Sequence, residues 1–292
     1  MAQQQTVAFL GLGGMGRPMA ANALRAGLPT VVWNRTPGSA QALADLGAQV
    51  AGSAAEAAGR AAIAVTMVTD IVAVTAIVVD QGALAALPPG AIWAQMSTIG
   101  VAGTERLAAL VQRERPDVVY VDAPVAGSRG PAEAGKLSIY ASGPIEARDR
   151  LAPLFDALGQ RTLWVGPAGQ GSRLKLVNNM LLAFLAEGVS ESVAMAHALG
   201  IGTETVLTAL AGNPIVPPWA EGKLPRMARD DYSPEFPLSL ALKDLLLALD
   251  AVDPAEFTVA GCLAAQWRRI VDRGFGGDDL TVVARAMTPG PA

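Results

Sequence analysis

The stretch Gly11-Leu12-Gly13-Gly14-Met15-Gly16 decides the fold of the first half of this chain. A short apolar run, Thr6–Leu10, comes directly before it and predicts a buried strand, and Arg17–Arg25 after it predicts a helix. The first fixed glycine permits a tight turn, the second lets a pyrophosphate approach the backbone, and the last lets helix and strand pack closely. The N–H groups and the dipole of the helix N-terminus favour the anion. The pattern predicts a Rossmann-type dinucleotide site, against the alternative of a glycine-rich turn in another α/β fold.

The end of the second expected strand indicates which dinucleotide is bound. Sites for an unphosphorylated ribose place Asp or Glu there, about 20 residues beyond the glycines. This chain has Asn34-Arg35-Thr36 instead, without an acid. A guanidinium can clamp a 2′-phosphate and stack on the adenine, and the flanking Asn and Thr can donate further hydrogen bonds. We therefore expect NADP(H), unless Arg35 is only a solvated surface residue.

The first half of the chain alternates short β-branched runs with Ala- and Leu-rich amphipathic stretches. This alternation is typical of a parallel sheet covered by helices on both faces. The expected strands are Thr6–Leu10, Thr30–Asn34, Ile63–Met67, Ile92–Gln95, Val118–Asp122, Leu137–Ala141 and Thr162–Val165. The expected helices are Met15–Ala26, Ser39–Leu46, Ile71–Val79 and Gly103–Arg113. These elements predict an α/β fold with a Rossmann-type doubly wound parallel sheet over residues 1–165.

The pattern changes near Gly166, where the strands end. One helical register runs from Gln170 to Leu199, about 45 Å at 1.5 Å per residue, which is long enough to join two domains. The later expected helices are Thr205–Ala211, Pro237–Val252, Thr258–Arg273 and Leu280–Ala286, with a rigid loop at Asn213–Pro218. Residues 166–292 are therefore expected to form an all-helical domain.

The composition argues against several classes of function. A formal net charge of −4 without a long basic run argues against a nucleic-acid partner. The single cysteine, Cys262, and the single histidine, His197, leave no Cys-based or multi-His metal site and no intramolecular disulfide. The chain shows no run apolar enough for a membrane span and no signal-peptide pattern. We expect a cytoplasmic protein, a buried Cys262, and a His197 that interacts with the C-terminal dipole of the long helix.

Several further motifs, in this order, make the chain resemble the β-hydroxyacid dehydrogenases, which include 3-hydroxyisobutyrate dehydrogenases and glyoxylate/succinic semialdehyde reductases. Besides the glycine loop they are Asp122–Gly127, Gly169–Asn179, Phe236–Leu238 with Lys243-Asp244, and Gly277–Asp279. The run Gly127–Glu133 looks closest to the glyoxylate/succinic semialdehyde reductase branch. The likeness covers most of the chain. It implies an active site in a cleft between the two domains, and a homodimer or homotetramer formed through the helical domain.

The resemblance also implies roles for single residues. Lys175 would be catalytic, and Asn179 and Asp244 would bind the substrate. Cofactor contacts would come from Val68 and Thr69 near the adenosine ribose, from Ser97 and Thr98 near the nicotinamide, and from Phe236 and Lys243 in the helical domain.

The residue types at Lys175 suit the reduction of a carbonyl. That reaction needs a hydride from the nicotinamide and a proton for the developing alkoxide, and an ammonium can attract the oxyanion and then donate. Asn178 and Asn179 follow Lys175 at helical spacing and bring amides to the same face. Adjacent asparagines are poor helix formers, which indicates a function for them here. The alternative for Lys175 is a lysine whose stem lies on an amphipathic helix while its charge reaches water.

One position departs from the family pattern. A serine commonly follows the Pro-Val of the motif at 122–125, and Ala126 stands there in this chain, so one donor for a substrate carboxylate is lost. Backbone N–H groups of Ala126 and Gly127 can still form an anion-binding nest, and Ser128 can supply a hydroxyl. The departure leaves specificity for an acid open.

Three hypotheses for the function follow. The first is an NADPH-dependent reductase of small aldehyde-acids, of the glyoxylate/succinic semialdehyde type, with Lys175 as general acid. The second is an imine reductase, which shares the architecture and a comparable Asn-Arg-Thr signature. Ala126 favours it, whereas Lys175 counts against it because those enzymes usually carry Asp or Tyr there. The third is a dinucleotide-binding module without catalysis, against which Lys175 and the two asparagines count.

Overall fold

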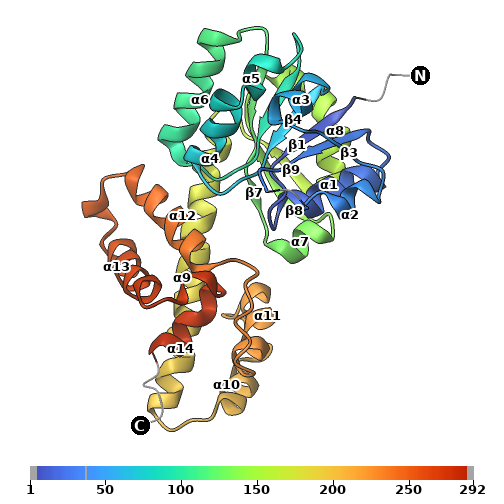
Figure 1. The fold of residues 1–292 in the computed structure, drawn as a ribbon. Coiled ribbons are helices and arrows are strands. Elements are labelled where there is room, and N and C mark those ends of the chain that lie inside the picture. Colours follow the sequence, from blue (N-terminus) through green and yellow to red (C-terminus); the bar gives the residue numbers. More distant parts are fainter. Residues whose placement is uncertain (1–4, 37, 288–292) are drawn as a thin grey trace. The chain divides into compact units, whose positions relative to one another are not determined.

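The chain forms two compact units, Met1–Lys175 and Leu176–Ala292, in a computed structural model that describes residues 5–36 and 38–287. The first unit contains the strands, and the second is built from helices and loops (Figure 1). The division lies inside the longest helix, α9 (Gln170–Ala198), whose first turns belong to the first unit. These features confirm the expected fold class, a doubly wound parallel sheet followed by an all-helical unit.

A six-stranded sheet in the order β3-β2-β1-β4-β5-β6 forms the centre of the first unit, and every neighbouring pair is parallel. The strands are β1 (Val7–Leu10), β2 (Thr30–Trp33), β3 (Gln49–Val50), β4 (Ile63–Thr66), β5 (Ile92–Gln95) and β6 (Val119–Asp122). Strands β1, β2, β4 and β5 are buried along their whole length, which explains their unbroken apolar sequence. The strand order reverses between β1 and β4, and the carboxyl ends at such a point form the ligand-binding edge of an open α/β sheet.

Helices cover both faces of this sheet. On one face, α1 (Gly16–Arg25), α2 (Gln41–Ala44), α7 (Arg129–Glu133) and α8 (Arg148–Leu158) contribute to a buried cluster around Phe9 and Val65. On the other face, α3 (Ala54–Gly59), α4 (Ile71–Thr75), α5 (Ala83–Ala86) and α6 (Gly100–Glu114) pack around Leu10 and Trp93. Successive side chains of each strand point to opposite faces, so each strand supplies both clusters.

A second, three-stranded sheet in the order β7-β8-β9 adjoins the first cluster. Strand β7 (Val125–Ala126) is antiparallel to β8 (Leu137–Ala141), and β8 is parallel to β9 (Gly159–Trp164). The sequence predicted the two longer strands but not their separation from the main sheet. It also missed β3 and β7, because two residues are too few to show a period.

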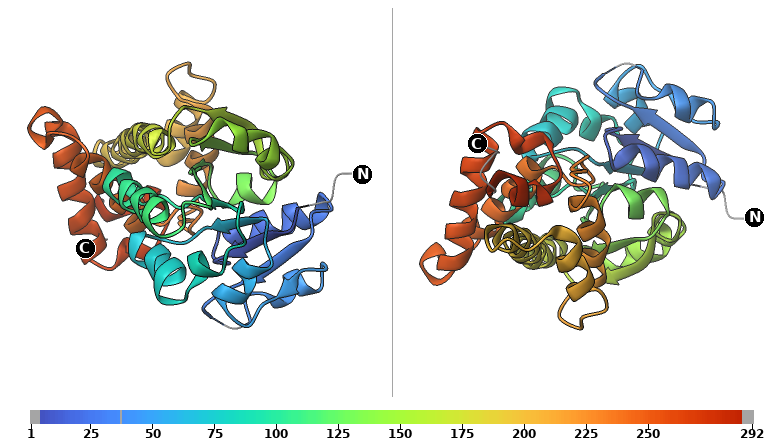
Figure 2. Two further views of the ribbon diagram at one scale, coloured as in Figure 1. Left: turned by 90° about the horizontal axis from the view of Figure 1, so that it is seen from above. Right: turned by 90° about the horizontal axis from the view of Figure 1, so that it is seen from below.

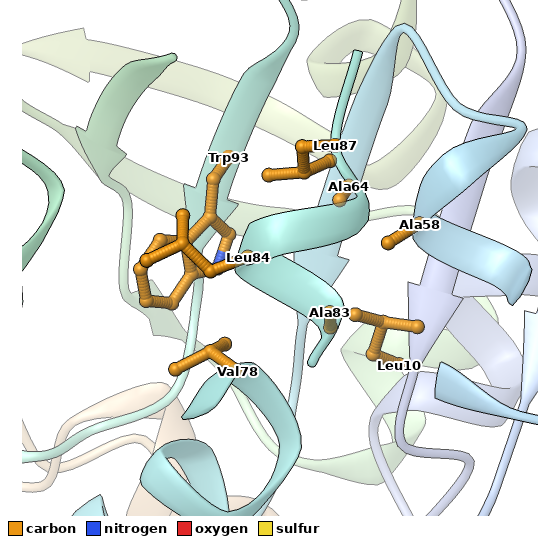
Figure 3. A pocket seen from close by; sticks show the side chains of 8 residues that line it. All are labelled: Leu10, Ala58, Ala64, Val78, Ala83, Leu84, Leu87 and Trp93. Atoms are coloured by element: carbon orange, nitrogen blue, oxygen red, sulfur yellow. The ribbon is translucent and has the colours of Figure 1, made fainter. Parts of the chain in front are cut away.

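The pocket drawn in Figure 3 is a packing gap inside the second cluster. Eight apolar side chains from β1, β4, β5, α3, α5 and the segment around Val78 line it, and Leu84 and Val78 lie beside the Trp93 ring. The gap has no room for even a water molecule and is therefore not a ligand site. A more open hollow of about 370 Å³ lies at the amino ends of β1 and β2, the sheet edge opposite the one that binds ligands in this fold.

The helical unit is arranged along α9. Its other helices are α10 (Thr203–Leu210), α11 (Pro218–Met227), α12 (Leu238–Asp250), α13 (Thr258–Asp272) and α14 (Val283–Met287). Both views of Figure 2 show α9 nearly end-on, with α12 and α13 on one side of it and α10 and α11 on another. The core of this unit gathers around Trp267, which is fully buried. Within residues 5–36 and 38–287, no helix has both the length and the apolar character that crossing a bilayer needs.

For this unit the sequence missed one helix, and one of its expectations was wrong. Helix α11 was not predicted because three prolines precede or begin it, yet Pro218 stands at its first position, where the missing N–H costs nothing. Cys262 was expected to be buried but is exposed on α13, since the buried face of that helix is formed by Ala260, Leu263, Ala264 and Trp267. His197 does lie in the last turn of α9, where its Nε2 and the Thr203 hydroxyl are 2.6 Å apart.

The carboxyl group of Glu187 gives the helical unit a pH-dependent stability. Burial against α13 raises its pKa to about 7, although the Trp267 indole N–H donates to it at 2.6 Å, and the neighbouring Glu191 raises the pKa further. Gln266 also donates to this carboxyl through its side-chain amide. Because the folded-state pKa is raised, the protonated carboxyl contributes to the stability of the fold. This contribution is fully present below the unfolded-state pKa of 4.5 and is lost as the pH rises through about 7.

We therefore expect the stability of the Glu187→Gln variant, relative to that of the wild type, to increase as the pH rises. The melting temperature of the variant minus that of the wild type should be roughly 1–4 °C higher at pH 8 than at pH 5, a modest shift because the carboxyl is partly solvated. Thermal scans at both pH values measure this difference. Glu191→Gln, at the exposed neighbouring carboxyl, is the matched control with a smaller change. An equal difference at the two pH values contradicts the prediction.

Candidate active site

The glycine loop between β1 and α1 has the geometry of a dinucleotide cradle. Gly11 has φ +108°, and a Cβ there would lie 2.6 Å from the Met67 carbonyl oxygen. A Cβ on Gly16 would lie 2.1 Å from the Gly11 carbonyl oxygen, so helix and loop are in direct contact. Above Gly13 and Gly14 a Cβ would meet nothing within 4 Å. The loop is therefore packed against protein at Gly11 and Gly16 and open at Gly13 and Gly14, which fits a pyrophosphate lying on its backbone.

The N–H groups of this loop are arranged for an anion. In the part of the chain that the structure describes, those of Gly13, Gly14 and Met15 have no acceptor. Met15, which precedes α1, gives the helix no side-chain cap. The positive end of the α1 dipole therefore faces the open space above the glycines, as anion binding requires.

Asn34 supports the loop from the end of β2. Its Oδ1 accepts the Leu12 N–H at 3.0 Å, and its Nδ2 donates to the Thr36 carbonyl at 3.1 Å and to Ser39 Oγ at 3.2 Å. Both ends of the Asn34 amide are thus bonded within the protein. The sequence did not indicate this structural role for Asn34. Arg35, by contrast, is exposed and makes no ion pair or hydrogen bond with the described residues.

The carboxyl ends of β4 and β5 are tied together by Ser97. Its hydroxyl accepts the Val68 N–H at 2.9 Å, and its backbone N–H and carbonyl are both bonded to the Gln95 side chain at 2.7 and 2.8 Å. Ser97 is fully buried, whereas its neighbour Thr98 is partly exposed. Thr69 lies just after Val68 and donates to the Asp70 carboxylate at 2.9 Å. The buried Ser97 therefore holds the carboxyl ends of the two strands together. Its neighbours Val68, Thr69 and Thr98 form the part of this edge that solvent reaches.

The motif around Ala126 lies on β7 and the turn into α7. Ala126 pairs with Ser138 of β8, and Gly127 has φ +127°, where a Cβ would lie 2.8 Å from Leu137 Cδ2. Ser128 precedes α7 without capping it, so its hydroxyl is not used by the helix. Among the described residues, no hydrogen bond joins this segment to the other predicted site residues.

Lys175 lies near the beginning of α9 and is 7% exposed. It belongs to the first unit, which also carries the glycine loop. Asn179 follows at i+4 on the same helix and is 4% exposed, so both side chains lie on one buried face. A buried ammonium is retained only where it is paired or functional, because its desolvation is costly.

In the helical unit, the structure brings Asn179 together with Asp244 of α12. Asn179 Nδ2 donates to Asp244 Oδ2 at 2.5 Å, and Asn178 Nδ2 donates to Asn179 Oδ1 at 3.0 Å. Lys243 Nζ lies 2.7 Å from Asp244 Oδ1, and Asp244 is 4% exposed. The Asn179 amide is therefore fixed in orientation.

A buried ion pair, which the sequence alone did not single out, holds the segment before α12. Lys223 Nζ lies 2.9 Å from Asp279 Oδ2, and both side chains are buried. The same carboxylate accepts the backbone N–H groups of Glu235 and Phe236 at 3.1 and 3.2 Å. This pair fixes the approach of the chain to α12, the helix that carries Lys243 and Asp244. Asp279 lies in the family motif Gly277–Asp279, but no sequence pattern around Lys223 indicated that these two residues would pair.

Comparison with known protein families covers almost all of the chain. The NAD binding domain of 6-phosphogluconate dehydrogenase matches residues 6–166, and the NAD-binding domain of NADP-dependent 3-hydroxyisobutyrate dehydrogenase matches residues 169–287. The chain belongs to the β-hydroxyacid dehydrogenase family. It is accordingly an oxidoreductase that uses a nicotinamide cofactor and acts on small molecules, as the sequence predicted.

Individual relatives agree with this family. Glyoxylate/succinic semialdehyde reductase 1 of Arabidopsis thaliana is 32% identical over 96% of this chain and 98% of its own length. NAD-dependent L-serine dehydrogenase of Pseudomonas aeruginosa is 33% identical over 97% of this chain and 98% of its own. The crystal structure of a 3-hydroxyisobutyrate dehydrogenase from Salmonella typhimurium superposes with a TM-score of 0.87 at 27% identity, over 96% of this chain and 99% of that one. The names of these relatives thus state different substrates.

Proposed function

We propose that this β-hydroxyacid dehydrogenase reduces small aldehyde-acids such as glyoxylate or succinic semialdehyde to the hydroxyacid, with NADPH as the hydride donor. The observation that carries the proposal is the buried Lys175 in the same unit as the glycine loop, followed one helical turn later by an Asn179 amide held by Asp244. The 32% identity to a glyoxylate/succinic semialdehyde reductase and the similar run Gly127–Glu133 support this substrate class.

The residues of the chain have separate parts in the proposed reaction. The bound nicotinamide supplies a hydride to the carbonyl carbon. Lys175 attracts the carbonyl oxygen as negative charge develops and then donates a proton from Nζ to it. Asn179 donates a hydrogen bond to the substrate in an orientation set by Asp244. The Gly127 N–H and the Ser128 hydroxyl bind the substrate carboxylate in place of the missing serine hydroxyl, because the Ala126 N–H is used in its pairing with Ser138.

For the cofactor, the proposal names the open glycine loop and the residues that surround it. The N–H groups of Gly13, Gly14 and Met15 bind the pyrophosphate, and Leu12 is held in place by Asn34. The exposed Arg35 guanidinium binds the 2′-phosphate, with Thr36 beside it. Val68, Thr69 and Thr98, at the carboxyl ends of β4 and β5, line the path of the dinucleotide. Ser97 positions them through the Val68 N–H. Phe236 and Lys243 contact the cofactor from the helical unit.

A substrate panel tests this function directly. Glyoxylate, succinic semialdehyde and a cyclic imine are assayed for reduction with NADPH and NADH, and 3-hydroxyisobutyrate and L-serine are assayed for oxidation with NADP⁺ and NAD⁺. We expect the highest kcat/KM for an aldehyde-acid with NADPH. Preference for the imine would assign an imine reductase, and preference for L-serine with NAD⁺ would reject both the substrate and the cofactor. Binding of NADPH without turnover of any compound would indicate a non-catalytic module.

We also propose that the helical unit forms a homodimer, or a homotetramer built from such dimers. An apolar stripe runs along the exposed face of α9, with Val177 68%, Leu181 61% and Met195 64% exposed and Phe184 between them at 37%. These positions recur at helical spacing and therefore share one face. Exposed apolar surface of this kind is typical of an interface between subunits.

The oligomer is tested by placing a charge in the stripe. Leu181→Glu should convert the assembly to monomers or lower its association at least tenfold, because an unpaired carboxylate would be buried in the interface. Size-exclusion chromatography with light scattering measures the mass. Val72→Glu, on α4 of the first unit at a residue 74% exposed, is the matched control that should keep the wild-type mass. A monomeric wild type, or an unchanged mass for Leu181→Glu, rejects this interface.

A further inference from the structure

The first turn of α9 is capped by residues from far away in the sequence. The residue before the helix is Gly169, which has no side chain with which to cap the N–H groups that begin a helix. Ser142 Oγ instead accepts the Gly171 N–H at 2.9 Å, and Asp122 Oδ2 accepts the Ser172 N–H at 2.8 Å. The cap therefore comes from the end of β6 and from the residue that follows β8.

Three hydroxyl groups, those of Ser142, Ser172 and Thr104, form a hydrogen-bond network around Asp122. Ser172 Oγ donates to Asp122 Oδ1 at 2.7 Å, which makes this carboxylate accept both the side chain and the backbone of the same residue. Thr104 Oγ1, on α6, lies 2.9 Å from Ser172 Oγ and also 2.9 Å from the Gly100 carbonyl oxygen. Ser142 Oγ lies 3.1 Å from Asp122 Oδ2 and completes the set. The Asp122 carboxyl group thus accepts from the Ser142 hydroxyl and from both the hydroxyl and the N–H of Ser172.

These groups are all buried, and their arrangement is costly to maintain. Asp122, Ser142 and Thr104 have 0% exposure, and Ser172 has 3%. Burial raises the pKa of Asp122, which the bonds from Ser172 and Ser142 oppose. A buried carboxylate is destabilising unless its acceptor sites are satisfied, and here they are. The negative charge also lies at the positive end of the α9 dipole, where it is favourable.

A close backbone approach accompanies the network. A Cβ on Gly171 would lie 2.1 Å from the Tyr140 carbonyl oxygen and 3.1 Å from the Asp122 carbonyl oxygen. The first turn of α9 is thus pressed against β8 and the end of β6 without an intervening side chain. Lys175 follows Ser172 by three residues, on the same face of the helix.

From this geometry we infer that Asp122 and Ser172 are positioning residues, which hold Lys175 in register with the carboxyl edge of the nucleotide-binding sheet. The inference rests on the proposed function insofar as Lys175 is the proton donor. All the residues that make the contacts, and Lys175 itself, belong to the first unit. The network therefore places the proton donor relative to the edge formed by β4, β5 and β6, independently of the helical unit. Its loss should affect the chemical step rather than dinucleotide binding, because among the described residues no hydrogen bond joins it to the glycine loop.

The test compares Asp122→Asn and Ser172→Ala with the wild type in two measurements. Asp122→Asn keeps the shape but turns an amide N–H₂ toward a donor. Ser172→Ala removes the hydroxyl, with its bonds to Asp122 and Thr104, and leaves the carboxyl group in place. We expect kcat for glyoxylate to fall about 10- to 100-fold in Asp122→Asn and by a smaller factor in Ser172→Ala, because a small misplacement of a catalytic group is costly. The Kd for NADPH should change less than about twofold. Ser172→Thr, which retains the hydroxyl, should retain kcat.

Hydrogen exchange of α9 supplies the second measurement, which does not depend on turnover. Amide exchange of residues 168–178 should be faster in Asp122→Asn, whereas that of residues 6–25 should match the wild type. Arg173→Ala is the matched control in the same turn, because Arg173 is exposed and its side-chain bonds, to Glu105 and to the Gly169 carbonyl, do not involve Asp122, Ser142 or Ser172. It should leave both kcat and exchange near the wild-type values.

The outcomes separate this inference from the proposed function. If the wild type reduces none of the panel compounds, the proposed function fails, and unchanged exchange of residues 168–178 in Asp122→Asn then rejects the anchoring by itself. If the wild type is active, an unchanged kcat in Asp122→Asn and Ser172→Ala rejects the positioning role, whatever the exchange shows. A parallel loss of kcat and NADPH binding also rejects it, because the defect is then not confined to the chemical step. If Asp122→Asn does not fold, Ser172→Ala with Ser172→Thr decides the question.

Discussion

Replacing Lys175 by alanine should lower kcat for an aldehyde-acid by about 10²- to 10⁴-fold, the usual contribution of a positioned general acid. The side chain is 7% exposed and lies in the first turns of α9, three residues after Ser172, which is bonded to Asp122. Removing its ammonium takes away both the charge that attracts the developing oxyanion and the proton that neutralises it. Binding of NADPH should remain within about threefold, since the glycine loop is formed by other residues. Steady-state kinetics and NADPH fluorescence titration measure the two quantities.

Two further variants make this result specific. Lys175→Arg keeps a positive charge that does not give up its proton near neutral pH, so it should remain at least tenfold below the wild type. Arg106→Ala, which truncates an exposed cation on α6, should leave kcat unchanged. If Lys175→Ala turns over substrate nearly as fast as the wild type, Lys175 is not the general acid, and another group supplies the proton.

Replacing Arg35 by alanine should weaken NADPH binding about 10- to 100-fold, the loss expected for charge-assisted hydrogen bonds to a phosphate. The Kd for NADH should change less than about threefold, because that cofactor carries no 2′-phosphate. Arg35 is exposed at the end of β2 and makes no ion pair or hydrogen bond with any described residue, so its removal breaks no such bond among them. Titration of each cofactor against protein fluorescence gives both constants.

Asn34→Ala is the matched comparison for Arg35→Ala. The Asn34 amide accepts the Leu12 N–H at 3.0 Å and holds the glycine loop from below. Its loss should therefore weaken NADPH and NADH by similar factors, whereas Arg35→Ala should weaken only NADPH. Equal weakening of both cofactors by Arg35→Ala would contradict the assignment of the 2′-phosphate to this residue. A wild-type preference for NADH would do the same.

The sequence predicted those parts of the fold that depend on local pattern. Strands β1, β2, β4 and β5 are buried on both faces, so each appears in the sequence as an unbroken apolar run. The long helix was predicted at Gln170–Leu199 and is observed as α9, Gln170–Ala198, because a helix of that length repeats its period many times. The two-residue strands β3 and β7 gave no such signal. Helix α11 was hidden by prolines that a first helical turn accepts.

The candidate site divides in a similar way. The glycine loop was predicted residue by residue, since its function depends on backbone that only glycine permits at Gly11 and Gly16. Lys175 with Asn178 and Asn179 was predicted because the three are close in sequence. By contrast, the exposed position of Cys262 depends on which face of α13 the rest of the helical unit covers, and the sequence expectation was wrong there.

By itself, the sequence determined that a dinucleotide-binding sheet is followed by a helical unit, and which residues carry the glycine loop and the candidate acid. Only the tertiary structure decided how those residues are held. Asp122 caps a helix that begins 48 residues after it, with a contact to Ser172 at a separation of 50 residues, and Lys223 pairs with Asp279 across 56 residues. Asn34 reaches back 22 residues to the glycine loop. Such contacts form only when strands and helices pack, so they leave no periodic or local signal along the chain, although they set the orientation of the groups that would do the chemistry.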